Sequence, residues 1–175
     1  MDSFCEQLIK IRRTAKDYAL LGLIWGGAFL LVYILVLLSF TYSALIGFLI
    51  LLIFGVMYGA GKLSKRLSIE YEYIVVNQDL DIDKIIGKSS RKRLVSLKLN
   101  ELEGIGRYDG QAKAKLASRH FDETFFCCNR EDEAVYLIGK HPKKGMVLLV
   151  AAMNERTLTE ALKAVPRAIR PPEFK

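Results

Sequence analysis

The sequence contains a run of 44 residues, from Tyr18 to Gly61, without a single charged side chain. A helix needs about 20 apolar residues to cross a bilayer, so the run is long enough for two crossings. The segment "SFTYS", residues 39–43, interrupts the Leu/Ile/Val/Phe pattern near the middle of the run. We therefore predict two transmembrane helices, at about residues 19–39 and 43–61, joined by a short turn within a hairpin of residues 18–61.

Two other interpretations fit the run less well. A helical hairpin buried in a soluble protein would need enough polar chain to cover two long helices that are apolar on every side, and 175 residues leave too little. A cleaved signal peptide has an apolar core of about 7 to 15 residues followed by a small-x-small cleavage site, and the sequence offers neither. The first helix is therefore expected to stay in the mature chain.

The charges that flank the run predict its orientation. The connecting turn has no Lys or Arg, whereas both outer ends are basic, with Lys10, Arg12, Arg13 and Lys16 before the first helix and Lys62, Lys65 and Arg66 after the second. By the positive-inside rule both ends face the cytoplasm. We expect a multi-pass protein of the plasma membrane with both termini in the cytoplasm.

Each predicted span carries a small-xxx-small pattern. These patterns are "GLIWG" and "GVMYG", with glycines at Gly22, Gly26, Gly55 and Gly59. Such patterns allow helices to approach closely, so the glycines are candidates for packing within the hairpin, or for homodimerisation. Neither span contains Asp, Glu, Lys, Arg or His, which argues against an ion pathway or a transported substrate.

The segment that precedes the first span, residues 1–17, has a helical pattern. Ser3 and Glu6 have capping-box spacing, and apolar residues then recur at three or four positions, at Phe4, Leu8, Ile11 and Ala15. We predict an amphipathic helix. Its apolar stripe can enter the membrane interface, with the basic residues against anionic headgroups, or it can pack on the cytoplasmic domain.

The remaining polar chain, residues 67–165, is long enough for one small domain. Alternating apolar residues predict a meander of three strands, at residues 68–76, 80–86 and 94–99, and then a weak strand at 105–108. The polar segment "DGQAKAKLAS" is expected to be a loop. Further strands are predicted at residues 123–128, 134–139 and 146–153. Asn154 should cap a closing amphipathic helix that Pro166 ends, and residues 166–175 form a tail.

A meander that opens with "EYEYIVVNQDLDIDKIIGKSSRKRLVSLKLNELEGI", followed by hairpins and a C-terminal helix, resembles the pleckstrin-homology-like domains that bacteria attach to membrane hairpins. The whole layout is similar to an uncharacterised family of small membrane proteins of Gram-positive bacteria. The resemblance implies an α+β fold: a partly open barrel of about seven strands, capped by the last helix, after the transmembrane hairpin. It also implies a module that binds lipids, peptides or proteins and is not an enzyme. In eukaryotic lipid-binding members the first strand-to-strand loop is basic. Here Asn77-Gln78-Asp79 is not, so inositol-lipid binding is not implied.

The stretch "DLDIDKIIGKSSRKR", Asp79 to Arg93, partly matches two ligand-binding motifs, a calcium loop and a phosphate-binding loop. A calcium loop that starts at Asp79 needs Gly at its sixth position and Glu at its twelfth, where Lys84 and Ser90 stand. A phosphate-binding loop that ends at Gly87-Lys88-Ser89 needs a Gly where Ile82 stands. We therefore predict no metal and no cofactor, and interpret the stretch as a strand, a turn and the start of the next strand.

The basic residues of this turn remain candidates for contact with anionic lipid headgroups, together with a second group in a later hairpin. They are Lys88, Arg91, Lys92, Arg93, Lys140, Lys143 and Lys144. Each Lys or Arg close to an anionic leaflet contributes about 1 kcal/mol. The alternative is a solvated turn that contributes only to the positive-inside bias. Nucleic-acid binding is disfavoured, because exposed aromatic residues are not interleaved with the basic ones and the domain is tied to a membrane.

Residues for covalent chemistry are scarce. Cys5, Cys127 and Cys128 are expected to be reduced packing residues in the cytoplasm. His120 and His141 lie at no ligand spacing, although a triad that includes Cys127 or Cys128 with His120 could assemble in space. We predict a non-catalytic module that presents a binding or scaffolding surface to a protein partner or to anionic lipid. The alternative is an accessory subunit that packs on a larger membrane complex through its glycines.

Overall fold

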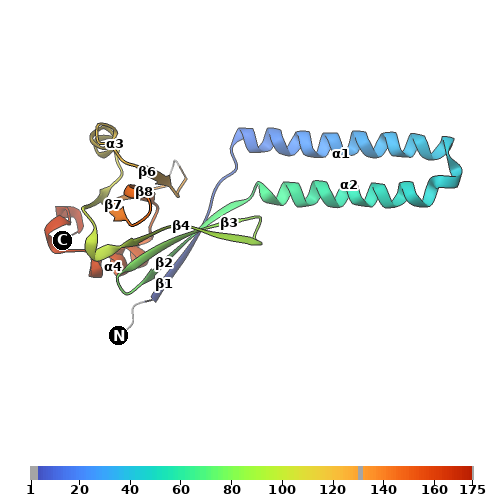
Figure 1. Cartoon of the computed structure of the whole chain (residues 1–175). Helices are drawn as coiled ribbons and strands as arrows, with labels where there is room; N and C mark the ends of the chain where they lie inside the picture. Colours follow the sequence, from blue (N-terminus) through green and yellow to red (C-terminus); the bar gives the residue numbers. More distant parts are fainter. Residues whose placement is uncertain (1–3, 130–131, 175) are drawn as a thin grey trace. The chain divides into compact units, whose positions relative to one another are not determined.

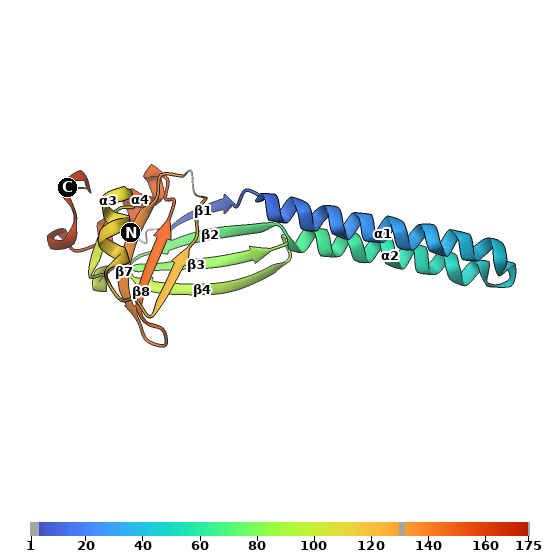
Figure 2. The same cartoon turned by 90° about the horizontal axis from the view of Figure 1, so that it is seen from above.

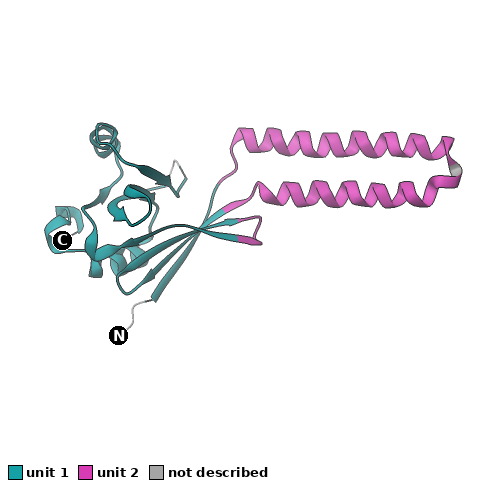
Figure 3. Cartoon of the chain, in the orientation of Figure 1, with its two compact units in different colours: residues 1–11, 70–85, 91–175 teal, residues 12–69, 86–90 magenta. Residues whose placement is uncertain are grey.

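The structure, a computed structural model, describes residues 4–129 and 132–174. The chain divides into two compact units (Figure 3). Unit 1 consists of residues 1–11, 70–85 and 91–175, and unit 2 of residues 12–69 and 86–90. Each unit therefore combines segments that lie far apart in the sequence.

Unit 2 is built on two antiparallel helices (Figure 1). These are α1 (Ala15–Thr41) and α2 (Ile46–Arg66), joined by the short 3-10 helix η1 (Ser43–Leu45). Both are long and apolar enough to cross a membrane, and only 6% and 11% of their apolar windows are buried in the protein. Core helices of a soluble domain would be mostly buried, so the packing within the chain does not account for these apolar surfaces. The two predicted helices are confirmed, each with about one more turn at its basic end.

The first sheet of the β structure contains four strands in sequential order (Figure 2). They are β1 (Phe4–Lys10), β2 (Ile69–Val76), β3 (Asp79–Ile86) and β4 (Ser90–Lys98). The predicted meander corresponds to β2, β3 and β4. Strand β1 pairs with β2 in antiparallel register, from Phe4 opposite Val76 to Lys10 opposite Glu70. The whole helical hairpin is thus inserted between two neighbouring strands of one sheet.

The amphipathic helix predicted for residues 1–17 is wrong over Phe4–Lys10, which form strand β1. Cys5 is buried and Ile9 packs against the core, with Gln7 between them on the same face. Because Gln7 is polar, the alternation of inward apolar and outward polar residues in this strand is not visible in the sequence. The Gln7 side chain is satisfied by the backbone, donating to the Ala152 carbonyl at 2.9 Å and accepting from the Asn154 N–H at 2.9 Å.

The second sheet is ordered β5 (Gly104–Arg107), β7 (Val135–His141), β8 (Gly145–Ala151) and β6 (Glu123–Phe126). Strand β6 runs parallel to β8, and the other pairs are antiparallel. The predicted loop at residues 109–118 is instead helix α3 (Gly110–Ala117), capped by the Asp109 carboxylate, which accepts from the Ala112 N–H at 2.7 Å. Its residues are good helix formers, and one buried leucine, Leu116, joins it to a small apolar cluster.

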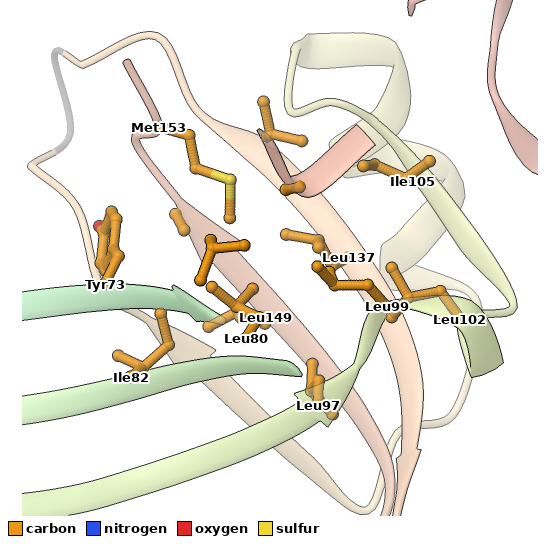
Figure 4. Close-up of a cluster of buried hydrophobic side chains, with 14 of the residues drawn as sticks. Tyr73, Leu80, Ile82, Leu97, Leu99, Leu102, Ile105, Leu137, Leu149 and Met153 are labelled. Atoms are coloured by element: carbon orange, nitrogen blue, oxygen red, sulfur yellow. The ribbon is translucent and has the colours of Figure 1, made fainter. Parts of the chain in front are cut away.

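The main core lies between the two sheets (Figure 4). Tyr73, Leu80, Ile82 and Leu97 come from the first sheet and meet side chains that include Leu137 and Leu149 of the second. Tyr73 is completely buried, and its hydroxyl donates to the Cys127 carbonyl at 2.5 Å and accepts from the Ala152 N–H at 3.3 Å. This phenol joins β2 to the segments that follow β6 and β8. Its burial raises the pKa of Tyr73 far above the usual value.

Helix α4 (Glu155–Ala164) closes the fold, as predicted, and buries Ala161 and Thr157 against the core. Asn154 is its N-cap, because its side-chain oxygen accepts from the Thr157 N–H at 2.7 Å. Two short 3-10 helices follow, η3 (Arg167–Ile169) and η4 (Pro172–Phe174), and a third, η2 (Leu99–Glu101), follows β4. The predicted fold class is confirmed: α+β, with two apolar helices and a β structure that forms no closed barrel. The described chain has eight strands instead of about seven, because β1 precedes the hairpin.

The presence of β1 corrects one comparison made from the sequence. Asn77 and Gln78 connect β2 to β3, which begins at Asp79, and this turn is therefore the second connection of the sheet. The first connection, between β1 and β2, is the helical hairpin itself, whose two ends carry six of the seven basic residues of unit 2.

Candidate functional site

The tight turn between β3 and β4, residues 86–90, belongs to the same compact unit as the helices (Figure 3). Gly87 and Lys88 have φ angles of 62° and 61°, the pattern of a two-residue type I′ hairpin. The Ser89 N–H donates to the Ile86 carbonyl at 3.3 Å, which closes the turn. The Gly87 N–H donates to the Ser68 carbonyl at 2.8 Å, just beyond the end of α2. The turn is therefore hydrogen-bonded to the segment that follows helix α2.

The end of α2 and this turn line a half-open cavity of about 730 Å³, which we call the basic cavity. Its cations, Lys62, Lys65 and Arg66, come from the last two turns of α2, where residues three or four apart share one face. On the other side lie Ser89 and Ser90 of the turn. None of the three cations forms an ion pair with a described residue.

Positive charge is concentrated in unit 2. This unit holds seven Lys or Arg and one acidic residue, Asp17, whereas unit 1 holds 19 basic and 18 acidic residues. Asp17 accepts from the Thr14 N–H at 2.7 Å at the start of α1. The β structure is thus nearly neutral, and most of the formal charge of +7 lies at the basic ends of the apolar helices and in the turn beside α2.

Two of the predicted lipid-contact residues, Arg91 and Arg93, are engaged in ion pairs. Arg91 lies 2.7 Å from a carboxylate oxygen of Glu72, whose side chain is 4% exposed. Arg93 bridges Asp81 at 2.8 Å and Asp83 at 3.0 Å. The hydrogen bond to Asp83 raises the pKa of Arg93, and burial raises the pKa of Glu72 although Arg91 opposes the shift.

The position of these arginines depends on a break in the alternation of β4. Leu94 and Val95 are neighbours in the sequence, yet both pack against the core. A β-bulge has this effect, because it shifts the pattern by one residue. The shift brings Arg91 and Arg93 to the face of the sheet that carries Glu72 and Asp83.

The other predicted contact residues are spread over two hairpins. Lys144 lies 2.7 Å from Glu123, with its ammonium 4.5 Å from the centre of the Phe125 ring. Four lysines have no ion-pair partner among the described residues: Lys88, Lys92, Lys140 and Lys143. Of these, Lys88 lies in the turn beside the basic cavity. The structure therefore gives the seven residues different surroundings.

The four glycines predicted to pack do not bring α1 and α2 close together. A methyl group built at Gly22, Gly26, Gly55 or Gly59 meets no atom within 4 Å. The buried residues of the hairpin are instead Ala28, Leu49 and Ala60. Packing of the hairpin through the glycines is therefore not observed, and their surfaces remain open within the chain.

Cys127 and His120 lack the environment of a nucleophilic site. Cys127 is 1% exposed, and burial raises its pKa to about 12, whereas a reactive cysteine needs a lowered pKa and access to solvent. His120 is 91% exposed and faces Asp122 at 4.0 Å. Among the described residues, no group of three His, Cys, Asp or Glu side chains is placed to hold a metal ion.

Sequence reasoning missed the basic cavity because Lys62, Lys65 and Arg66 were interpreted only as orientation signals. The i, i+3 and i, i+4 spacing of these three residues was visible and predicts one helical face. Their proximity to Ser89 and Ser90 was not visible, because more than 20 residues separate the two segments in the sequence.

A family model described as "Bacterial PH-like domain (DUF6106)" matches residues 1–170. The chain belongs to this family. The match includes β1, the helical hairpin and the C-terminal helix, so the family is defined over the whole arrangement and not only over the β structure. No curated protein and no solved structure matches the chain.

Proposed function

We propose that this member of the family is a non-catalytic membrane protein. In this proposal α1 and α2 cross the plasma membrane and hold a PH-like binding or scaffolding module at its cytoplasmic surface. The module recruits a protein partner or contacts anionic lipid. The observation that carries the proposal is the pairing of β1 with β2 over seven residue pairs across the helical hairpin.

The pairing of β1 with β2 supports a topology in which both ends of the helical hairpin lie on the same side of the membrane. Residues 4–10 precede α1 and residues 70–76 follow α2, yet they form neighbouring strands. Because the backbone groups of a sheet must be paired with one another, the sheet cannot be divided by a bilayer. If both helices span, both ends of the hairpin lie on one side. The excess of Lys and Arg at these ends, with none in the connecting turn, makes that side the cytoplasm.

Cysteine accessibility tests this arrangement in intact cells. Ala44, in the connecting turn, and Ser118, after α3, are exposed positions for single cysteines. In a chain whose native cysteines are replaced by alanine, a membrane-impermeant maleimide should label A44C from outside. It should label S118C only after lysis. Labelling of both positions from outside, or of neither, would reject the proposed topology.

Binding by the module is tested separately, by purification of the full chain in mild detergent and identification of the proteins that stay with it. A partner of the PH-like module should be lost when the surface of unit 1 is changed and the helices are kept. A partner that depends only on the helices supports the second candidate below.

The second candidate is an accessory subunit whose helices pack on a larger membrane complex, or on a second copy of the chain. The open surfaces at Gly22, Gly26, Gly55 and Gly59 favour it, because packing within the hairpin does not use them. The variant G26L/G59L should release a partner held by the helices. Co-purification that is unchanged by this variant counts against the second candidate and leaves the first.

A further inference from the structure

The basic cavity has the charge expected of an anion site. Three basic residues, Lys62, Lys65 and Arg66, line the cavity, and Lys88 lies in the adjoining turn. Within the described part of the chain, no acidic residue lines the cavity. The C-terminal end of a helix carries a partial charge of about −0.5, which opposes an anion, but three full positive charges outweigh it.

The neutral groups around the cavity add hydrogen-bond donors. Three residues that carry a hydroxyl group also line it: Ser89 and Ser90 from the turn, and Tyr58 from α2. Hydroxyls and ammonium or guanidinium groups together suit the oxygen atoms of a phosphate group. A volume of about 730 Å³ is sufficient for a group larger than inorganic phosphate, such as a phosphoglycerol headgroup.

The position of the cavity along α2 favours a lipid as the source of this phosphate. Lys62 is the first charged residue after the 44-residue uncharged run, and Tyr58 lies one turn before it. In a spanning helix, this transition from apolar to basic residues coincides with the headgroup layer, where tyrosine is also enriched. A headgroup can therefore reach the cavity from the side while its acyl chains stay in the bilayer.

We propose that the basic cavity binds the phosphate of an anionic phospholipid, with Lys62, Lys65 and Arg66 as counter-charges and the hydroxyls of Ser89 and Ser90 as hydrogen-bond donors. The inference rests on the proposed membrane anchoring. It differs from the contact surface predicted from the sequence, because the three main cations come from α2 and Arg91 and Arg93 take no part.

Native mass spectrometry of the full chain in detergent tests the site, with phosphatidylglycerol and phosphatidylcholine as the added lipids. The wild-type protein should retain one phosphatidylglycerol with at least about tenfold preference over phosphatidylcholine, since each basic residue near an anionic group contributes about fivefold. The variant K62Q/K65Q/R66Q should lose this preference. The control K92Q/K140Q/K143Q removes the same charge from unit 1 and should keep it.

A second variant separates the cavity from the charge that orients the hairpin. S90W places a bulky neutral side chain at the rim and leaves every cation in place, so it should also abolish the preference. Retention of the preference in both cavity variants, or equal loss in the control, would overturn the proposal. Displacement of the lipid by millimolar inorganic phosphate would assign the site to a soluble phosphate and overturn the lipid assignment.

The cysteine-labelling pattern of A44C and S118C distinguishes this result from a failure of the proposed function. If labelling follows the expected topology and no lipid preference is found, only the cavity assignment is wrong. If the labelling pattern fails, the membrane anchoring on which the cavity assignment rests is wrong as well.

Discussion

The backbone N–H of Gly87 donates a 2.8 Å hydrogen bond to the carbonyl of Ser68. This bond joins the β3–β4 turn to the segment just after the end of helix α2. The approach is close, because a Cβ atom built on Gly87 would lie 3.0 Å from the Lys65 carbonyl oxygen. Gly87 also has a φ of 62°, which L-residues with a Cβ rarely adopt. Both the conformation and the close contact at this position favour glycine.

Replacing Gly87 by alanine should therefore destabilise the protein by about 1 to 3 kcal/mol. The neighbouring Lys88 provides a matched control, because its φ is 61° but it carries a side chain. The change Lys88→Gly relieves strain and should be neutral or stabilising by up to about 1 kcal/mol. Thermal unfolding of the purified full chain measures both. An equal, small effect of the two changes would contradict the close contact with α2.

The buried phenol of Tyr73 gives a second prediction. Tyr73→Phe removes the hydroxyl that donates to the Cys127 carbonyl and accepts from the Ala152 N–H, and leaves two buried backbone groups without this partner. We expect a loss of about 1 to 3 kcal/mol in the free energy of unfolding. Tyr71, half-buried on the same strand, has no hydroxyl partner among the described residues. The control Tyr71→Phe should stay within about 0.5 kcal/mol of the wild type.

The thiol of Cys127 should be inert in the native protein. Burial raises its pKa to about 12, so at pH 8 it is protonated as well as inaccessible. Iodoacetamide should modify it only on unfolding, and mass spectrometry of quenched samples can follow the reaction. Rapid native alkylation at pH 8 would show that the site is open.

The same shift gives a pH dependence of stability. The Cys127 thiol has a lower pKa in the unfolded chain than in the folded protein. Its contribution to the free energy of unfolding is therefore complete below about pH 9 and is lost as the pH rises toward 12. The free energy of unfolding should therefore decrease over this interval, and Cys127→Ala should reduce the slope. A slope that is unchanged by Cys127→Ala would argue against a buried thiol.

The sequence predicted the elements whose signals are local. The uncharged run gave the two apolar helices, the alternation in residues 69–76 gave β2, and Asn154 gave the cap of α4. It failed at β1, because the partner of this strand lies about 60 residues further along the chain and its own apolar residues also fit helical spacing. The polar residue Gln7 on the inner face of β1 also favoured the incorrect helix prediction. Its hydrogen-bond partners, at Ala152 and Asn154, are likewise far away in the sequence.

The candidate site was only partly accessible to sequence reasoning for the same reason. The basic turn was recognised, but the ion pairs of Arg91 with Glu72 and of Arg93 with Asp81 and Asp83 depend on strand register and on the break in the alternation of β4. The basic cavity depends on the approach of the turn to α2, which the Gly87 hydrogen bond establishes. Neither relationship leaves a periodic pattern in the sequence.

The insertion of the hairpin between two strands predicts which fragments fold. Residues 68–175 alone lack β1 and expose the edge of β2, so this fragment should aggregate or unfold. Because Lys10 lies opposite Glu70, a turn of a few residues can replace the hairpin. Residues 1–11 joined by such a linker to residues 68–175 should give a soluble protein with a cooperative thermal transition. Circular dichroism compares the two, and a fragment as stable as the fusion would contradict a structural role for β1.

The chain before α1 and the chain after α2 form one sheet, and cross-strand disulfide formation in the full chain is the sharpest test of this pairing. Phe4 and Val76 are directly opposite and both exposed, so F4C/V76C in a chain without native cysteines should cross-link under mild oxidation. Leu8 is also exposed but is paired with Glu72, four residues away from Val76 along β2, so L8C/V76C should not cross-link. Efficient cross-linking of the first pair alone is the predicted result. Absence of the F4C/V76C bond, or equal yields for both pairs, would contradict the pairing on which the account depends.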